Sequence, residues 1–179
     1  GSTGIAFTGC PDATCNNKIA IKLIKRKNSY GLGPSNPSNV EVTFLKKLRT
    51  LFERHLTPHI TLLYFDFECN IKDSILKHRY LLRSHQKSSW KRTLWNELIQ
   101  KKITNNIPVV VTELANGGDL DKFLRKTQRT TDELFILLFQ LFHILTVAQY
   151  YFPGFRHNDL KPDNVLVHLY TKKNDTYTL

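Results

Sequence analysis

The alternation of hydrophobic and polar positions predicts a chain that begins with strands and continues mostly as helices. Residues 40–54 carry apolar side chains every three or four positions, which is the period of an amphipathic helix. Alternating or β-branched runs bounded by Gly, Pro, Asn and Ser predict strands. These strands are expected at 5–10, 18–24, 60–67 and 108–114, with a final hairpin formed by 165–169 and 176–179.

The second half of the chain contains a long, uncharged apolar stretch. A short helix is expected at 119–126, and Thr130 and Glu133 have the spacing of a capping box before a helix at 131–152. A membrane-spanning helix needs about 20 apolar residues, so the length is borderline. Polar side chains such as Gln140 interrupt the stretch and would be unfavourable in lipid. A buried core helix, and no membrane span, is therefore expected.

Composition places the chain among globular proteins. Of 179 residues, 41% are hydrophobic and 23% are charged, which excludes a disordered tail and a collagen-like fibre. Strands with one helix come first and helices follow, so an α+β fold with two lobes is expected. The chain has no methionine and begins with glycine, so we expect it to be part of a longer protein.

The chain is strongly basic, with 26 Lys and Arg against 15 Asp and Glu and a net charge of +11. Such a charge attracts phosphates, nucleic acid or acidic proteins. Residues 68–106 hold nine basic residues against three acidic ones, together with Trp90 and Trp95. This basic insert is either a docking surface for an acidic substrate or nucleic acid, or a solvated, partly helical segment that keeps the protein soluble. The second interpretation is favoured.

The three cysteines point to a reducing, intracellular compartment. Their number is odd, and Cys10, Cys15 and Cys69 form no C-x-x-C pair. The pattern argues against a disulfide framework and against a zinc site.

The candidate chemistry is concentrated in one loop between the long helix and the next strand. Asp159 is followed by Lys161 and then by Asn164. Phosphoryl transfer needs an acceptor for the proton of the incoming hydroxyl, positive charge near the transferred phosphate and an oxygen ligand for Mg²⁺. These three side chains could supply one each. The alternative is a polar turn with an incidental Asp, which the specificity of the string makes improbable.

The segment 157–164, His-Asn-Asp-Leu-Lys-Pro-Asp-Asn, resembles the catalytic loop H-R-D-L-K-P-x-N of eukaryotic-type protein kinases. It is also similar to loops in serine/threonine kinases of large cytoplasmic DNA viruses such as poxviruses, iridoviruses and ascoviruses. Lys161 and Pro162 favour Ser or Thr over Tyr as the acceptor. Asn158 stands where the family has an Arg that pairs with a phosphorylated activation loop, so switching by that route is not expected.

Upstream segments resemble other kinase landmarks in the family's order. Ile-Ala-Ile-Lys at 19–22 is similar to the V-A-I-K strand, whose Lys pairs with the α- and β-phosphates of ATP. The resemblance makes Lys22 that residue and Glu41, on the next helix, its partner. The end of the glycine-rich phosphate loop is represented by Gly1, Ser2, Thr3 and Gly4.

Residues 110–114 resemble the hinge strand, with Thr112 as gatekeeper. The resemblance implies that backbone at Glu113 and Ala115 binds the adenine edge and that Asp119 faces the ribose.

The resemblance implies a protein-kinase-like two-lobe fold that stops before the D-F-G motif and the activation loop. Residues 1–114 would form the N-lobe, and 115–179 the hinge and the start of the helical C-lobe. The implied function is ATP- and Mg²⁺-dependent phosphorylation of Ser or Thr on protein substrates by the full-length protein, with this fragment inactive alone. The implied location is intracellular, in the host cytoplasm or the virion if the source is a virus.

Three alternatives from other classes stay open at this point. The protein could be a pseudokinase or binding module without catalysis. It could be a small-molecule phosphotransferase of kinase-like fold, although such enzymes usually lack the Lys-Pro pair. It could also be a basic nucleic-acid-binding protein whose affinity resides in 68–106.

Overall fold

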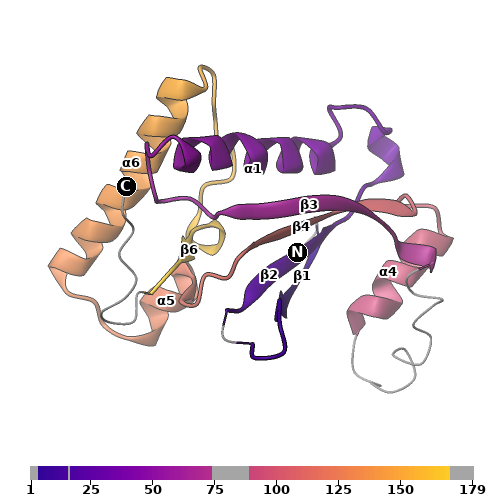
Figure 1. Cartoon of the computed structure of the whole chain (residues 1–179), viewed down its shortest axis with the longest axis horizontal. Coiled ribbons are helices and arrows are strands. Elements are labelled where there is room, and N and C mark those ends of the chain that lie inside the picture. Colours follow the sequence, from indigo (N-terminus) through magenta and orange to yellow (C-terminus); the bar gives the residue numbers. More distant parts are fainter. Residues whose placement is uncertain (1–3, 16, 74–88, 170–179) are drawn as a thin grey trace. The chain divides into compact units, whose positions relative to one another are not determined.

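A computed structural model describes residues 4–15, 17–73 and 89–169 (Figure 1). The chain divides into two compact units. The first combines Gly1–Phe44 with Leu63–Thr112, and the second combines Leu45–Leu62 with Glu113–Leu179. Helices and an antiparallel sheet occur together, which confirms the α+β class. The N-lobe and C-lobe limits expected from the sequence stay a prediction.

The first unit is built on a four-stranded sheet in the order β1-β2-β4-β3. The strands are β1 (Gly4–Gly9), β2 (Ile19–Ile24), β3 (Leu63–Asn70) and β4 (Asn106–Glu113). The pairs β1–β2 and β3–β4 are antiparallel, and the register places Ala6 opposite Lys22. All four strands lie within a few residues of their predicted positions. The helix expected at 40–54 is α1 (Pro37–Glu53), which begins one turn earlier.

The basic insert contributes to the core of the first unit. Helix α4 (Ser89–Ile99) lies within it, and Leu94 on this helix is 1% exposed. Leu94 packs in one cluster with Ile71, Ile103 and Ile107. The expectation of a solvated segment was therefore wrong, although its helical character is confirmed. Leu94 and Leu98 are one helical turn apart and share a face, so the high overall charge of the insert concealed an apolar stripe.

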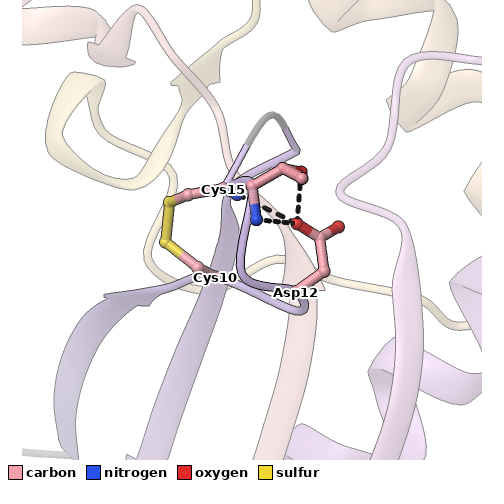
Figure 2. Close-up of a disulfide and its surroundings, with 4 residues drawn as sticks. Cys10, Asp12 and Cys15 are labelled. Atoms are coloured by element: carbon pink, nitrogen blue, oxygen red, sulfur yellow. Dashed lines mark hydrogen bonds between the residues drawn. A yellow bond between two sulfur atoms is a disulfide. The ribbon is translucent and has the colours of Figure 1, made fainter.

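A disulfide joins Cys10 to Cys15 in the turn between β1 and β2, which corrects the expectation that the cysteines form no such bond. Figure 2 shows the turn closed by Asp12, whose Oδ1 accepts hydrogen bonds from the backbone N–H groups of Thr14 (2.8 Å) and Cys15 (2.9 Å) and from the Thr14 hydroxyl (2.5 Å). The Thr14 hydroxyl is the main cause that lowers the pKa of Asp12. The turn brings the two cysteine Cα atoms to 4.8 Å, a proximity that a search for C-x-x-C spacing does not detect.

The second unit contains the end of α1, two further α-helices and a small two-stranded sheet. The two further helices are α5 (Leu120–Lys126) and α6 (Thr131–Tyr151), and the latter begins at the predicted capping box of Thr130 and Glu133. Strands β5 (Gly118–Asp119) and β6 (Leu166–Val167) are antiparallel. The partner of β6 is thus β5, whereas residues 176–179 of the expected hairpin lie outside the described residues.

Helix α6 forms where it was predicted, but it is largely exposed. Ala148 is the one buried residue described on it. The prediction of a buried core helix was therefore wrong for the described chain, because apolar composition shows a tendency to be buried and does not supply a partner. Within the described residues, α6 is also the one helix that has the length and apolar composition to cross a membrane. Its exposed apolar residues include Leu134, Phe135, Ile136, Leu138, Phe139, Phe142 and Tyr150.

Candidate functional site

The residues predicted to handle a nucleotide lie in two groups, one in each unit. In the first unit, the ammonium of Lys22 on β2 forms an ion pair with the Glu41 carboxylate on α1. The two side chains are 35% and 29% exposed, so the pair is neither fully solvated nor sealed in the core. A cation held in this way can bind an anionic group while its own carboxylate partner fixes its direction.

Local sequence explains why Glu41 reaches this position. Asn36 precedes α1 as its N-cap, and its Oδ1 accepts hydrogen bonds from the Ser38 N–H (3.1 Å) and the Ser38 hydroxyl (2.8 Å). Pro37 follows at the first helical position, where its missing N–H is not needed. Glu41 therefore lies just beyond the first turn of a firmly capped helix.

Gly4 lies directly beside the Lys22 side chain. A Cβ atom at Gly4 would lie 2.5 Å from the Leu23 carbonyl oxygen and 3.1 Å from Lys22 Cε. Glycine is therefore required for β1 to approach β2 this closely. Gly1, Ser2 and Thr3, which complete the predicted phosphate loop, lie outside the described residues.

In the second unit, Asp159 is held by its own loop. The Asn164 side-chain amide donates to Asp159 Oδ2 (2.7 Å) and to the Asp159 carbonyl oxygen (2.8 Å). Lys161 Nζ lies 3.5 Å from Asp159 Oδ1. A 3-10 turn over Pro162–Asn164 presents the amide, and Asn158 adopts a positive φ of 58°, which Asn tolerates better than most residues. The loop geometry thus brings the three predicted side chains together.

This group is open to solvent and suited to an incoming ligand. The side chains of Asp159 and Lys161 are 68% and 50% exposed. Asn164 uses its Nδ2 toward Asp159, so its Oδ1 is the atom that could bind a cation. Among the described residues no three His, Cys, Asp or Glu side chains form a metal-binding group. Mg²⁺ usually takes one or two protein oxygens together with substrate phosphates, so an oxygen donor such as Asn164 Oδ1 fits that ion.

The residues expected to form the hinge are held by hydrogen bonds to nearby backbone groups. Glu113, at the end of β4, donates its N–H to the Leu62 carbonyl (3.0 Å), and its Oε1 accepts from the Leu62 N–H (2.9 Å). The N–H of Glu113 is thus engaged within the chain, and the predicted adenine contact at Glu113 stays a prediction. The Ala115 carbonyl accepts from Gly118 N–H at 3.1 Å, and among the described residues no hydrogen bond involves the Ala115 N–H.

Asp119 serves as a helix cap. Its Oδ1 accepts from the Lys122 N–H (2.9 Å), and its Oδ2 pairs with Lys122 Nζ (2.5 Å). The hydrogen bond with the Lys122 side chain is the main cause that lowers the pKa of Asp119 and raises the pKa of Lys122. Both carboxylate oxygens are thus engaged locally, and the predicted contact with a ribose stays a prediction.

Sequence reasoning missed a polar network centred on Arg26, two residues after the end of β2. The available signals were weak. Arg26 follows Lys25 at the end of a strand, a pattern that is usual for solvated charges, and Asn36-Pro37 is the only local sign of a helix start nearby.

Comparison with known proteins gives one informative relative. No protein-family model matches the chain. The chain is 30% identical over 173 residues, 93% of its own length, to the candidate serine/threonine-protein kinase R400 of Acanthamoeba polyphaga mimivirus. It spans about 37% of the length of that relative. The chain therefore has a kinase-like viral relative. That relative comes from a mimivirus, which does not support the poxvirus, iridovirus or ascovirus type expected from the loop.

Proposed function

We propose that the protein to which this chain belongs is a serine/threonine protein kinase that uses ATP and Mg²⁺. The observation that carries the proposal is the loop 157–164, in which Asn164 binds the Asp159 carboxylate and Lys161 lies beside it. The Lys22–Glu41 ion pair and the similarity to a kinase-like mimivirus protein support the same proposal.

In this proposal the residues that bind the phosphates of the nucleotide belong to the first unit. Lys22, directed by Glu41, would hold the α- and β-phosphates. The glycine-rich backbone of residues 1–4 would offer its N–H groups to the same phosphates. Glu113 and Ala115 would bind the adenine edge, and Asp119 would face the ribose. Residues 1–114 and 115–179 would form the N-lobe and the beginning of the C-lobe.

The second unit would supply the groups for transfer. Asp159 would orient the acceptor hydroxyl and accept its proton, while Lys161 would stabilise the negative charge on the migrating phosphoryl group. Asn164 would bind Mg²⁺, which neutralises phosphate charge. The acceptor would be a Ser or Thr of a protein substrate, inside the host cell or the virion.

The substitution Asp159→Asn in the full-length protein tests this proposal. It keeps the side-chain size and removes the proton acceptor, so kcat should fall by about 10²- to 10⁴-fold while ATP affinity stays near that of the wild type. Asp163→Asn is the matched control, because it removes a carboxylate from the same turn without touching Asp159. Turnover should be measured with a general protein substrate and ATP binding by calorimetry.

The outcomes separate the proposal from its alternatives. Wild-type turnover in Asp159→Asn would contradict the catalytic assignment. ATP binding without measurable transfer in the unmodified protein would favour a pseudokinase or binding module. Transfer to a small molecule, with none to protein, would favour a small-molecule phosphotransferase.

A further inference from the structure

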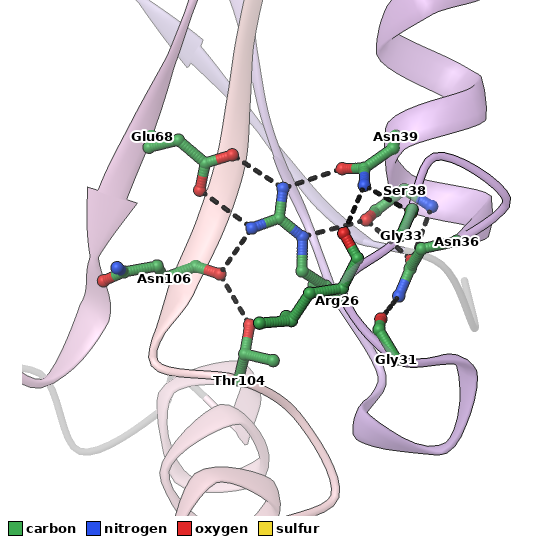
Figure 3. A network of polar contacts seen from close by, with 10 residues as sticks. Arg26, Gly31, Gly33, Asn36, Ser38, Asn39, Glu68, Thr104 and Asn106 are labelled. Atoms are coloured by element: carbon green, nitrogen blue, oxygen red, sulfur yellow. Dashed lines mark hydrogen bonds and ion pairs between the residues drawn. The ribbon is translucent and has the colours of Figure 1, made fainter.

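Arg26 is the centre of a polar network that joins three strands and a helix. It lies two residues after the end of β2, and its side chain is 12% exposed. Its Nη1 and Nη2 donate to Glu68 Oε2 (3.0 Å) and Oε1 (2.6 Å), and Nη1 also donates to the Asn106 carbonyl oxygen (3.3 Å). Figure 3 shows the guanidinium between β3 and β4 on one side and the start of α1 on the other.

The remaining donors of the guanidinium bind α1. Arg26 Nη2 donates to Asn39 Oδ1 (2.8 Å), and Nε donates to the Ser38 hydroxyl (3.4 Å). Asn39 in turn donates its Nδ2 to the Gly33 carbonyl (2.8 Å). Ser38 and Asn36 are 2% and 1% exposed, so this junction is buried. All five N–H groups of Arg26 are therefore engaged.

The network lies within one helical turn of Glu41. Ser38 and Asn39 precede Glu41 by three and two residues, and a turn of α-helix has about 3.6 residues. The segment that begins with β2 thus contacts α1 at two points, through Lys22 to Glu41 and through Arg26 to Ser38 and Asn39. Two contacts on one turn fix both the position of the helix along its axis and its rotation about that axis.

We propose that Arg26 is a positioning residue for the Lys22–Glu41 ion pair. By holding the first turn of α1 against the sheet, it keeps the Glu41 carboxylate at the Lys22 ammonium, so the pair forms without an external signal. The inference rests on the proposed function, because the pair is expected to direct Lys22 toward ATP. A planar guanidinium is suited to this role, since a lysine could not contact Glu68 and Asn39 with the same fixed geometry.

The neighbouring residue offers a matched control. Lys25 forms an ion pair with Glu97 on α4 at 2.8 Å, and its side chain is 10% exposed. Lys25 and Arg26 thus have similar burial and adjacent positions, and each is paired with a glutamate. The difference lies in what the two side chains contact. Lys25 binds α4, whereas Arg26 binds β3, β4 and α1.

The experiment compares Arg26→Gln with Lys25→Gln in the full-length protein. Arg26→Gln should weaken ATP binding about three- to tenfold and raise KM for ATP more than it lowers kcat, while Lys25→Gln changes ATP affinity by less than about twofold. Glu41→Gln should also weaken ATP binding. Because Arg26 acts through Glu41, adding Arg26→Gln to Glu41→Gln should cause no further loss.

Hydrogen exchange supplies a measurement that does not depend on ATP. Backbone amides at 38–43 should exchange faster in Arg26→Gln than in Lys25→Gln, since only the first substitution releases the start of α1. Unchanged exchange at these amides would overturn the inference.

The results also separate this inference from the proposed function. If the losses caused by Arg26→Gln and Glu41→Gln add, or if Lys25→Gln weakens ATP binding as much as Arg26→Gln does, Arg26 is general structural support and the inference is overturned while the proposed function stands. If Lys22→Met binds ATP like the wild type, the proposed function fails. Hydrogen exchange then decides alone whether Arg26 holds the turn that carries Glu41.

Discussion

The two units of the chain place their apolar residues differently. The first unit buries residues from its strands and from α4, so that Leu94 and Ile107 are 1% and 0% exposed. In the second unit, the most apolar helix, α6, leaves Phe135 and Phe139 67% and 66% exposed. The highly charged basic insert thus supplies core residues, while the apolar helix α6 is largely exposed to solvent. Burial follows the presence of a packing partner more closely than it follows average hydrophobicity.

The candidate chemistry shows the same contrast. Lys22 and Glu41 are partly buried and come from a strand and a helix that are separated in the sequence. Asp159, Lys161 and Asn164 are exposed, and their hydrogen bonds join residues within a single loop. The first group depends on the packing of its unit, whereas the second depends on local loop conformation.

The largest expected difference in stability concerns Leu94 and Phe139. In the 179-residue chain, Leu94→Ala should reduce the free energy of unfolding by about 2–5 kcal/mol, because it leaves a cavity in a packed cluster. Phe139→Ala should change it by about 0.5 kcal/mol or less, since the ring is exposed. Denaturant unfolding followed by circular dichroism would measure both. A loss above about 2 kcal/mol for Phe139→Ala would show that the face of α6 is covered.

A smaller difference in unfolding free energy is expected between the N-caps of α1 and α6. Asn36→Ala should cost about 2 kcal/mol, because Asn36 is buried and its Nδ2 also donates to the Gly31 carbonyl at 2.6 Å. Thr130→Ala should cost about 1 kcal/mol, since its capping box is exposed. Thermal unfolding of both variants would test the order. Equal losses would show that burial adds nothing to the cap of α1.

The smallest expected effect is a dependence of the stability of the second unit on pH. Burial, and then the neighbouring His143, lower the pKa of His59. The folded state therefore binds the proton less readily than the unfolded state, and its stability is complete above the usual pKa of about 6.5. That stability should be lost as the pH falls through the lowered value.

The first unit provides the reference for this measurement, since its described residues contain no histidine. Hydrogen exchange measured at pH 7 and pH 5 should show that the second unit is less stable to unfolding at pH 5. The substitution His59→Phe should make this loss of stability smaller. An equal loss with and without His59 would assign the effect to other groups.

Several elements were predictable because their determinants lie close together in the sequence. The capping box of Thr130 and Glu133 spans four residues, and it marks the start of α6 correctly. The strands were found from their alternation, with limits that moved by a few residues. The disulfide was missed because the turn at Asp12, and not a motif spacing, brings Cys10 to Cys15.

Other features required the arrangement of the strands. The role of Leu94 in the core was hidden by the charge of its surroundings, although its spacing from Leu98 was a usable signal. Arg26 carried no such signal, because its partners Glu68 and Asn106 lie 42 and 80 residues further along the chain. No local pattern identifies partners at those separations.

The sequence by itself determined the local elements and named the candidate residues, because helical period, strand alternation and caps depend on neighbours within a turn or two. It also determined the loop that joins Asp159 to Asn164, since both ends lie in the same short segment. Only the tertiary structure decided that Lys22 meets Glu41, that Arg26 holds the start of α1 and that α4 rather than α6 is packed. Those outcomes depend on which strands become neighbours, and that order is set by the packing of the whole unit.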